Sequence, residues 1–111
     1  MAGKFEVTQR SNGEFQFNLK AGNGQVILTS EGYSNKAGCT NGIESVRKHA
    51  ASDANFERKT AKDGRPYFSL KASNGQAIGK SEMYKSEAAR DNGIKSVMEN
   101  APDAKVDDKT A

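Results

Sequence analysis

Few side chains in this sequence could carry out catalysis. The chain has a single histidine, His49, and a single cysteine, Cys39. A zinc site ordinarily needs three or four such ligands, so this pair cannot build one. Gly22 and Gly24 lie at the tip of a predicted hairpin that no helix follows, which argues against a phosphate-binding loop. We therefore expect a protein that is not an enzyme and that has no cofactor and no metal.

A polar motif that occurs twice could line a binding site. Ser30-Glu31-x-Tyr33 returns later in the chain with Glu82 and Tyr84. In one interpretation the tyrosines pack at the edge of a sheet, and the glutamates favour the N-terminus of the helix that follows. In the other, each Glu-x-Tyr pair binds a ligand, and the two pairs are related by an internal twofold axis.

A second repeated motif places Asn-Gly inside each predicted helix, at Asn41-Gly42 and Asn92-Gly93. A glycine costs a helix about 1 kcal/mol relative to alanine, so its presence in both helices needs a reason. Close packing of the helix on the sheet is one explanation. The other is a polar groove between the helices, lined by Asn41 and Asn92, which would take a small ligand.

Basic side chains cluster once, at Arg58, Lys59, Lys62 and Arg65. The corresponding positions in the other half of the chain are not basic, so the cluster is not part of the repeat. A solvated loop is the simple interpretation. The alternative is binding to the phosphate backbone of a nucleic acid, which would be strongly salt-dependent.

The elements that must position these residues follow from an internal repeat at a spacing of 51 residues, in which Phe5-Glu6 returns as Phe56-Glu57. A twofold repeat folds as a built-in dimer. A half of this length is too short to bury a good core alone. We therefore expect a single domain over residues 1–111, in which repeats 1–53 and 54–111 share one core.

Hydrophobic patterning predicts the elements of each half. Alternating apolar and polar residues predict three strands, over residues 4–9, 15–20 and 25–29 of the first half. The spacing of apolar residues then changes to three and four, which predicts an amphipathic helix. This helix should begin after Asn35, a good N-cap, and end near His49.

The third strand of the first half carries two further predictions. Asn23-Gly24 should supply the positive-φ residues of a tight hairpin before it. If Ile27 faces the helices, Val26 and Leu28 lie on the opposite, open face of the sheet. The small apolar patch that they form there is either plain surface or a contact site.

The end of the chain repeats once more. At a spacing of 50, residues 103–111 align with residues 53–61. The strand that opens the second repeat therefore also closes the first, as a long middle strand shared between the halves, and the last strand is a degenerate third copy. The predicted fold class is α+β, with two tandem β3-α-β repeats forming one antiparallel sheet and two helices packed on one face.

These motifs resemble the YegP-like family of uncharacterised bacterial proteins. The resemblance rests on Leu-Lys-Ala-x-Asn-Gly-Gln, Ser-Glu-x-Tyr and Asn-Gly-Ile-x-Ser-Val, each of which occurs in both halves. It implies a β3-α-β unit whose C-terminal strands are exchanged between the halves about a pseudo-twofold axis. Single-copy relatives would pair as dimers, and the tandem would be the fused equivalent, so we expect a monomer. The resemblance implies no function, because the family has none assigned.

Composition and charge limit the class of partner and the cellular compartment that we expect for the protein. The net charge of +3 is well short of that of a dedicated nucleic-acid binder. One cysteine fits a reducing compartment. No apolar stretch approaches the length that spans a bilayer, and the start of the chain lacks the apolar core of a signal peptide. We expect a cytoplasmic protein that does not associate with membranes.

The lack of catalytic side chains, together with the open surfaces of the sheet, favours a binding function. The preferred hypothesis is a module that binds a protein or peptide partner, either through a sheet edge by strand addition or through the open face. One alternative is weak nucleic-acid binding through the cluster at residues 58–65. The other is a small ligand held between the helices.

Overall fold

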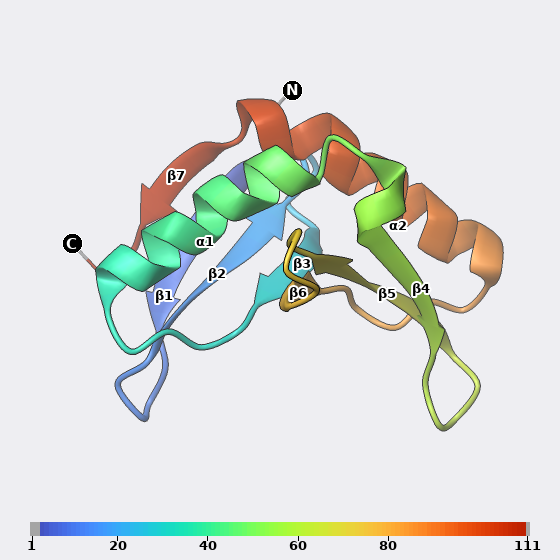
Figure 1. The fold of residues 1–111 in the computed structure, drawn as a ribbon, viewed down its shortest axis with the longest axis horizontal. Helices are drawn as coiled ribbons and strands as arrows, with labels where there is room; N and C mark the ends of the chain where they lie inside the picture. The colour runs from blue at the N-terminus through green and yellow to red at the C-terminus, as the bar shows by residue number, and fades with distance from the viewer. Residues whose placement is uncertain (1–2, 111) are drawn as a thin grey trace.

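A computed structural model describes residues 3–110, and Met1, Ala2 and Ala111 lie outside the described residues. The prediction that the start of the chain is not a signal peptide rests partly on Met1 and Ala2 and so lies partly outside them. Three strands and a helix occur twice and are followed by a last strand (Figure 1). The strands are β1 (Lys4–Gln9), β2 (Phe15–Lys20), β3 (Val26–Ser30), β4 (Phe56–Thr60), β5 (Pro66–Lys71), β6 (Ala77–Lys80) and β7 (Lys105–Asp108). The helices are α1 (Lys36–His49) and α2 (Glu87–Asn100), and the short 3-10 helices η1 (Asp53–Asn55) and η2 (Ala101–Asp103) follow them.

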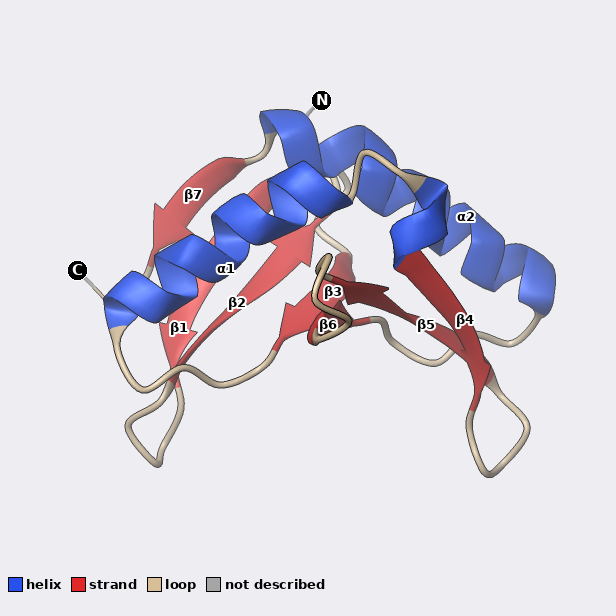
Figure 2. Ribbon diagram, in the orientation of Figure 1, coloured by secondary structure: helices blue, strands red, loops and turns tan. Residues whose placement is uncertain are grey.

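The seven strands form one sheet in the order β4-β5-β6-β3-β2-β1-β7. Both helices cover the same face of this sheet (Figure 2), which confirms the predicted α+β fold. All neighbouring strands are antiparallel except β1 and β7, which are parallel. A parallel pair needs a long crossover connection. Here the whole chain between the first and the last strand provides it.

A pseudo-twofold axis passes through the centre of the sheet. Thr29 and Lys80, which are counterparts in the repeat, lie opposite one another where β3 pairs with β6. Each helix packs on strands of both halves, because α1 contacts β2, β5 and β6 while α2 contacts β5 and β3. The buried apolar residues form one cluster. The two halves therefore share a single core, as expected from their length.

The strand after each helix crosses to the outer side of the other half. β4 follows α1 and pairs with β5, and β7 follows α2 and pairs with β1. This confirms the exchange of C-terminal strands. β4 closes the first β3-α-β unit and opens the second, as predicted, but the expected long middle strand is wrong, because β4 spans only Phe56–Thr60 after η1 and lies at the end of the sheet.

The predicted starts of both helices are confirmed, and the predicted positive-φ residues of the β2–β3 hairpin are partly wrong. The side chain of Asn35 accepts the N–H of Gly38 at 2.7 Å, and Ser86 caps α2 in the same way. In the β2–β3 hairpin only Gly24 has a positive φ, of 86°; Asn23 does not. The loop closes through a turn that ends on the glycine rather than through a two-residue turn, so one positive-φ residue suffices.

A β-bulge in β3 overturns the prediction that Leu28 lies on the open face. Leu28 is opposite Leu19, but Val26 is opposite Lys20, so Ile27 is an extra residue in the ladder. The bulge places both Ile27 and Leu28 in the core, where their exposed fractions are 5% and 0%. Simple alternation failed here because it assumes that no residue is inserted.

Candidate functional site

The tyrosine of each Glu-x-Tyr motif packs between a sheet phenylalanine and a helix glycine. Tyr33 stacks on Phe17, with ring centroids 6.4 Å apart and 11° between the ring planes, and its hydroxyl lies over Gly42. Tyr84 makes the same contacts in the second half. Burial is the main cause that raises the pKa of both hydroxyls. The Glu-x-Tyr and Asn-Gly motifs are thus two parts of one packing unit.

The polar members of these motifs lie on the surface. Glu31, Glu82, Asn41 and Asn92 are all exposed. Asn41 and Asn92 fall in the first halves of their helices, which start on opposite sides of the molecule and approach one another at their C-terminal ends (Figure 1). The structure does not bring the two asparagines together, and the hypothesis of a ligand groove lined by both gains no support from it.

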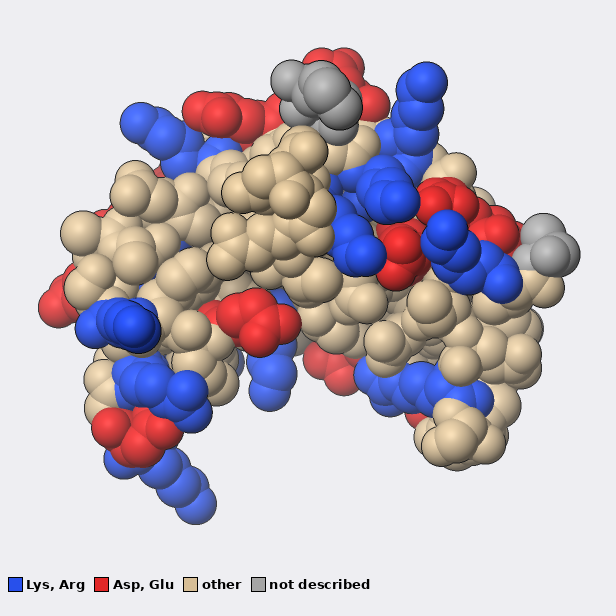
Figure 3. Space-filling model, turned by 180° about the vertical axis from the view of Figure 1, so that it is seen from behind, with Lys and Arg blue, Asp and Glu red and all other residues tan. Residues whose placement is uncertain are grey.

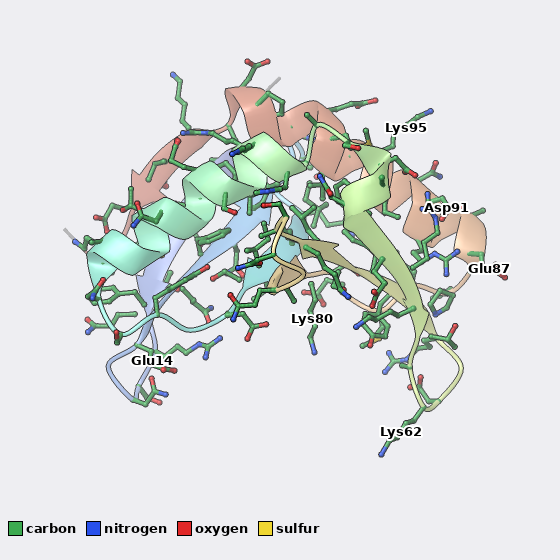
Figure 4. All side chains as sticks on the ribbon, viewed as in Figure 1. Glu14, Lys62, Lys80, Glu87, Asp91 and Lys95 are labelled. Atoms are coloured by element: carbon green, nitrogen blue, oxygen red, sulfur yellow. The ribbon has the colours of Figure 1, made fainter. Side chains whose placement is uncertain are left out.

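Three of the four residues of the basic cluster are paired with carboxylates. The pairs are Arg58 with Asp53 and Asp91, both at 3.1 Å, Lys59 with Glu57 at 3.0 Å, and Arg65 with Asp63 at 2.7 Å. Figure 3 shows Lys and Arg atoms lying beside Asp and Glu atoms on the face that it presents. Lys62 is at the tip of the β4–β5 hairpin (Figure 4). Because consecutive residues of a strand face opposite ways, Arg58 and Lys59 do not share a surface.

The histidine and the cysteine have structural environments. His49 Nδ1 lies 2.8 Å from the carbonyl oxygen of Ser45, and its Nε2 accepts the N–H of Ser73 at 3.2 Å, which ties the end of α1 to the β5–β6 hairpin. Cys39 is a fully buried free thiol, and burial is the main cause that raises its pKa. Within residues 3–110, no three His, Cys, Asp or Glu side chains gather in a way that could hold a metal ion. Neither helix of that region is long and apolar enough to cross a membrane.

The two outer edges of the sheet differ, and this difference defines the candidate site. In the first half β7 covers β1, with Val106 opposite Phe5 and Asp108 opposite Val7. The contacts that hold β7 are Lys4 to Asp107 at 3.2 Å, Lys36 to Asp108 at 3.0 Å, the Arg47 guanidinium to the Ala104 carbonyl at 2.6 Å, and the Lys109 N–H to the Val7 carbonyl at 2.9 Å. Main-chain and side-chain contacts together hold β7 on the outer side of β1.

The Asp108 contact should make the pairing of β7 with β1 depend on pH. Hydrogen bonds from Thr110 and the ion pair with Lys36 lower the pKa of Asp108 from 3.8 to about 2. A carboxylate whose pKa is lower in the folded state than in the unfolded state stabilises the folded state when the pH is above its unfolded pKa. This stabilisation is lost as the pH falls through the folded-state pKa. We expect the N–H of Lys109 to lose protection between about pH 4 and pH 2.

Hydrogen exchange followed by NMR, corrected for the intrinsic exchange rate, measures this loss. In Asp108→Asn the protection should already be reduced at neutral pH and should change little over the same range. Constant protection of the Lys109 N–H in the native protein would contradict the assignment of Asp108 as an anchor.

In the second half the corresponding edge is β4, the last strand of the sheet on that side. Phe68 lies opposite Arg58 but gives its carbonyl to the N–H of Ser81, on the side away from β4. In an antiparallel ladder the residue opposite must likewise face away, so the N–H and carbonyl of Arg58 point outward. The same holds for Thr60, because the carbonyl of the opposite Pro66 is also used away from β4. Such a row of main-chain groups is a template for an added strand.

A hollow of about 400 Å³ adjoins the start of β4. It is lined by residues 54–57 and by Lys71, Ala72, Ser73 and Gly75 of the β5–β6 hairpin. The counterpart hollow in the first half is lined in addition by residues 105–107 of β7. The first-half hollow thus has β7 as one wall, and no strand of residues 3–110 forms that wall beside β4.

Sequence reasoning pointed to a sheet edge without saying which one, and it missed the outward main chain of Arg58 and Thr60. A signal was present in the three copies of the strand motif, which form β1, β4 and β7. Each end of the sheet has an inner and an outer position for such a strand, which makes four positions. Three strands cannot fill four positions, so one inner strand, here β4, has no outer neighbour among the described residues.

Comparison with known proteins identifies related chains. A family model described as a domain of unknown function, DUF1508, matches residues 11–57 and 61–108. A UPF0339 protein of Bordetella pertussis is 57% identical over 99% of this chain and 98% of its own length. The UPF0339 protein YegP of Shigella flexneri is 48% identical over 99% of this chain and 100% of its own length.

Two solution NMR structures share the fold. The UPF0339 protein of Shewanella oneidensis superposes with a TM-score of 0.91 at 55% identity and covers 97% of this chain and 92% of its own. The protein of unknown function YegP from E. coli superposes with a TM-score of 0.93 at 47% identity and covers 98% and 94%. The repeat and the exchanged strands thus belong to an architecture that these proteins have in common.

Proposed function

This chain belongs to the DUF1508 family, as a two-repeat relative of YegP, and on that premise we propose that it is a non-catalytic module that binds an extended peptide segment by strand addition to β4. The observation that supports the proposal is a difference between two counterpart strands: β7 pairs with the outer side of β1, whereas within residues 3–110 no strand pairs with the outer side of β4. In strand addition, main-chain hydrogen bonds supply affinity, and neighbouring side chains select the partner.

The pairing of β7 with β1 is the template that we propose for a guest strand. Phe56 and Arg58 are the counterparts of Phe5 and Val7 in the repeat. A guest in the register of β7 would therefore run parallel to β4 and lie opposite these two residues. The N–H and carbonyl of Arg58 would take the part that the main chain of Val7 plays toward β7.

The proposal also includes the oligomeric state and the cellular compartment of the protein. The halves already pair with one another inside the chain, which supports a monomer. The buried free thiol of Cys39 and the absence of a second cysteine fit a reducing compartment such as the cytoplasm. The relatives named above come from bacteria.

Proline at position 58 separates main-chain binding from side-chain binding. Arg58→Pro removes the outward N–H and leaves the β4–β5 ladder intact, because that N–H does not face β5. Arg58→Ala loses the same ion pairs and keeps the N–H. We expect peptides selected on the wild-type protein from a displayed library to bind Arg58→Ala, and to bind Arg58→Pro about tenfold more weakly. Isothermal titration of synthetic copies measures the affinities.

Lys59→Pro is the matched control for folding. The main chain of Lys59 faces β5, so proline there should lower the melting temperature more than Arg58→Pro does. Peptides that bind Arg58→Pro as tightly as Arg58→Ala would contradict the proposed strand addition. A selection that yields no peptide dependent on β4 would do the same.

A further inference from the structure

We propose that the segment bound at β4 is basic: a parallel strand with an apolar residue beside Phe56 and, two positions later, a lysine or arginine that meets Glu87. This inference rests on the proposed strand addition and adds the chemistry of the partner. The side chains that hold β7 in the first half have counterparts of different charge in the second half.

Every cationic side chain that holds β7 is replaced in the second half. The counterparts of Lys4, Lys36 and Arg47 are Asn55, Glu87 and Met98. Two neutral residues and one acid thus stand where three cations hold the last strand. An acidic strand such as β7, with its Asp107 and Asp108, would meet no cation at these places. These three positions therefore disfavour a second copy of β7 at the β4 edge.

The helix side of the β4 edge has an excess of negative charge. A chain of ion pairs runs from Asp53 to Arg58, Asp91, Arg90 and Glu87, with successive contacts of 3.1, 3.1, 3.2 and 3.7 Å. Three carboxylates and two guanidinium groups leave one negative charge unbalanced. Glu87 has the longest contact, and its side chain is 80% exposed, so it is the carboxylate most available to a guest cation.

The position of Glu87 on α2 determines which residue of the guest strand its carboxylate would meet. Figure 4 labels Glu87 and Asp91 on α2, and the Arg58–Asp91 ion pair joins this helix to β4. In the first half Lys36, the counterpart of Glu87, contacts Asp108, the β7 residue opposite Val7. The guest residue opposite Arg58 corresponds to Asp108. Its charge should be inverted just as that of its helix partner is, because the Arg58 guanidinium beside it is already paired with Asp53 and Asp91.

The apolar position lies two residues before the basic one, because alternate residues of a strand share a face. In the first half Val106 lies opposite Phe5, whose ring is covered by the Arg47 guanidinium at 5.4 Å from the ring centroid. In the second half the counterpart of Arg47 is Met98, which packs against the core. The second half thus has an apolar side chain, Met98, at the position where the first half has the cation over Phe5.

Two synthetic peptides of about eight residues, roughly a strand's length, test the charge. Both carry valine at the apolar position, and two residues later one has lysine and the other aspartate. We expect the wild-type protein to bind the lysine peptide about fivefold more tightly in low salt. Glu87→Lys should reverse the preference, and Glu87→Gln should reduce it. Fluorescence anisotropy measures the affinities, and the preference should shrink at about 0.5 M NaCl.

Glu31→Lys is the matched control, because it makes the same change of charge at an exposed glutamate in the first half. It should leave the preference for the lysine peptide as it is. Equal binding of the two peptides, lost in Arg58→Pro, would overturn the basic partner while leaving strand addition in place. Tighter binding of the aspartate peptide, or no binding of either peptide, would also overturn the basic partner. The library selection described above then tests strand addition separately. Self-association in sedimentation that Arg58→Pro abolishes would identify a second copy as the occupant and reject a basic segment.

Discussion

Replacing Leu28 by alanine should lower the free energy of unfolding by about 3 kcal/mol, because the side chain is fully buried and alanine leaves a cavity. Val26→Ala should cost less than about 1 kcal/mol, since Val26 is only half-buried. Chemical denaturation followed by circular dichroism measures both. Equal costs at the two positions would contradict the bulge that places Leu28 in the core.

The pseudo-twofold axis explains why only one half has a leucine at this position. The counterpart of Leu28 is Gly79, and a Cβ on Gly79 would lie 2.9 Å from the Leu28 Cγ. One large side chain fills the space beside the axis, so the other half has to leave it empty. We therefore expect Gly79→Leu to restore part of the stability lost in Leu28→Gly, since it supplies the leucine from the other side. Losses that simply add in the double variant would show that the two positions do not share this space.

Adding a methyl group to both helix glycines, in a Gly42→Ala and Gly93→Ala double variant, should lower the free energy of unfolding by about 2–4 kcal/mol. The sign is informative, because alanine in a helix interior otherwise gains about 1 kcal/mol over glycine. A Cβ on Gly42 would lie 2.8 Å from Cζ of Tyr33 and 3.1 Å from Cε2 of Phe17. Tyr33 cannot easily move away, because its main chain donates to and accepts from Phe15, both at 2.7 Å. Denaturant titration gives the free energies.

Removing the tyrosine hydroxyl provides the control for this prediction. Gly42→Ala should cost less in a Tyr33→Phe background, where the atom nearest to the added methyl is gone but the ring remains. A gain in stability from Gly42→Ala in the native background would show that the glycine is not there to accommodate Tyr33.

The repeated motifs and the candidate site thus have different origins. Tyr33 and Gly42 recur in the second half because both halves need the same contact between helix and sheet. The β4 edge depends on residues that the halves do not share: Arg58 has Val7 as its counterpart, and Glu87 has Lys36. A repeat conserves its packing in both copies. A site on only one copy is therefore expected where the copies differ.

Local sequence patterns were enough to predict the elements and their layers. The alternation in β2, the Asn35 cap and the stripe of buried residues on α1 depend on contacts within a few residues, and each is confirmed. The internal repeat extended these predictions to a shared core, and the resemblance to the YegP-like family added the exchange of strands. The elements and the shared core can be predicted because each follows from spacing along the chain.

The bulge at Ile27 and the choice of the open edge were decided only by the tertiary structure. Residues 103–111 resemble β4, and no periodicity indicates that this last segment covers β1 and leaves β4 open. Its place depends on contacts across the length of the chain, such as that of Asp108 with Lys36, where the second half has Glu87. Pairing between distant strands depends on which side chains meet in space, and local spacing does not contain that information.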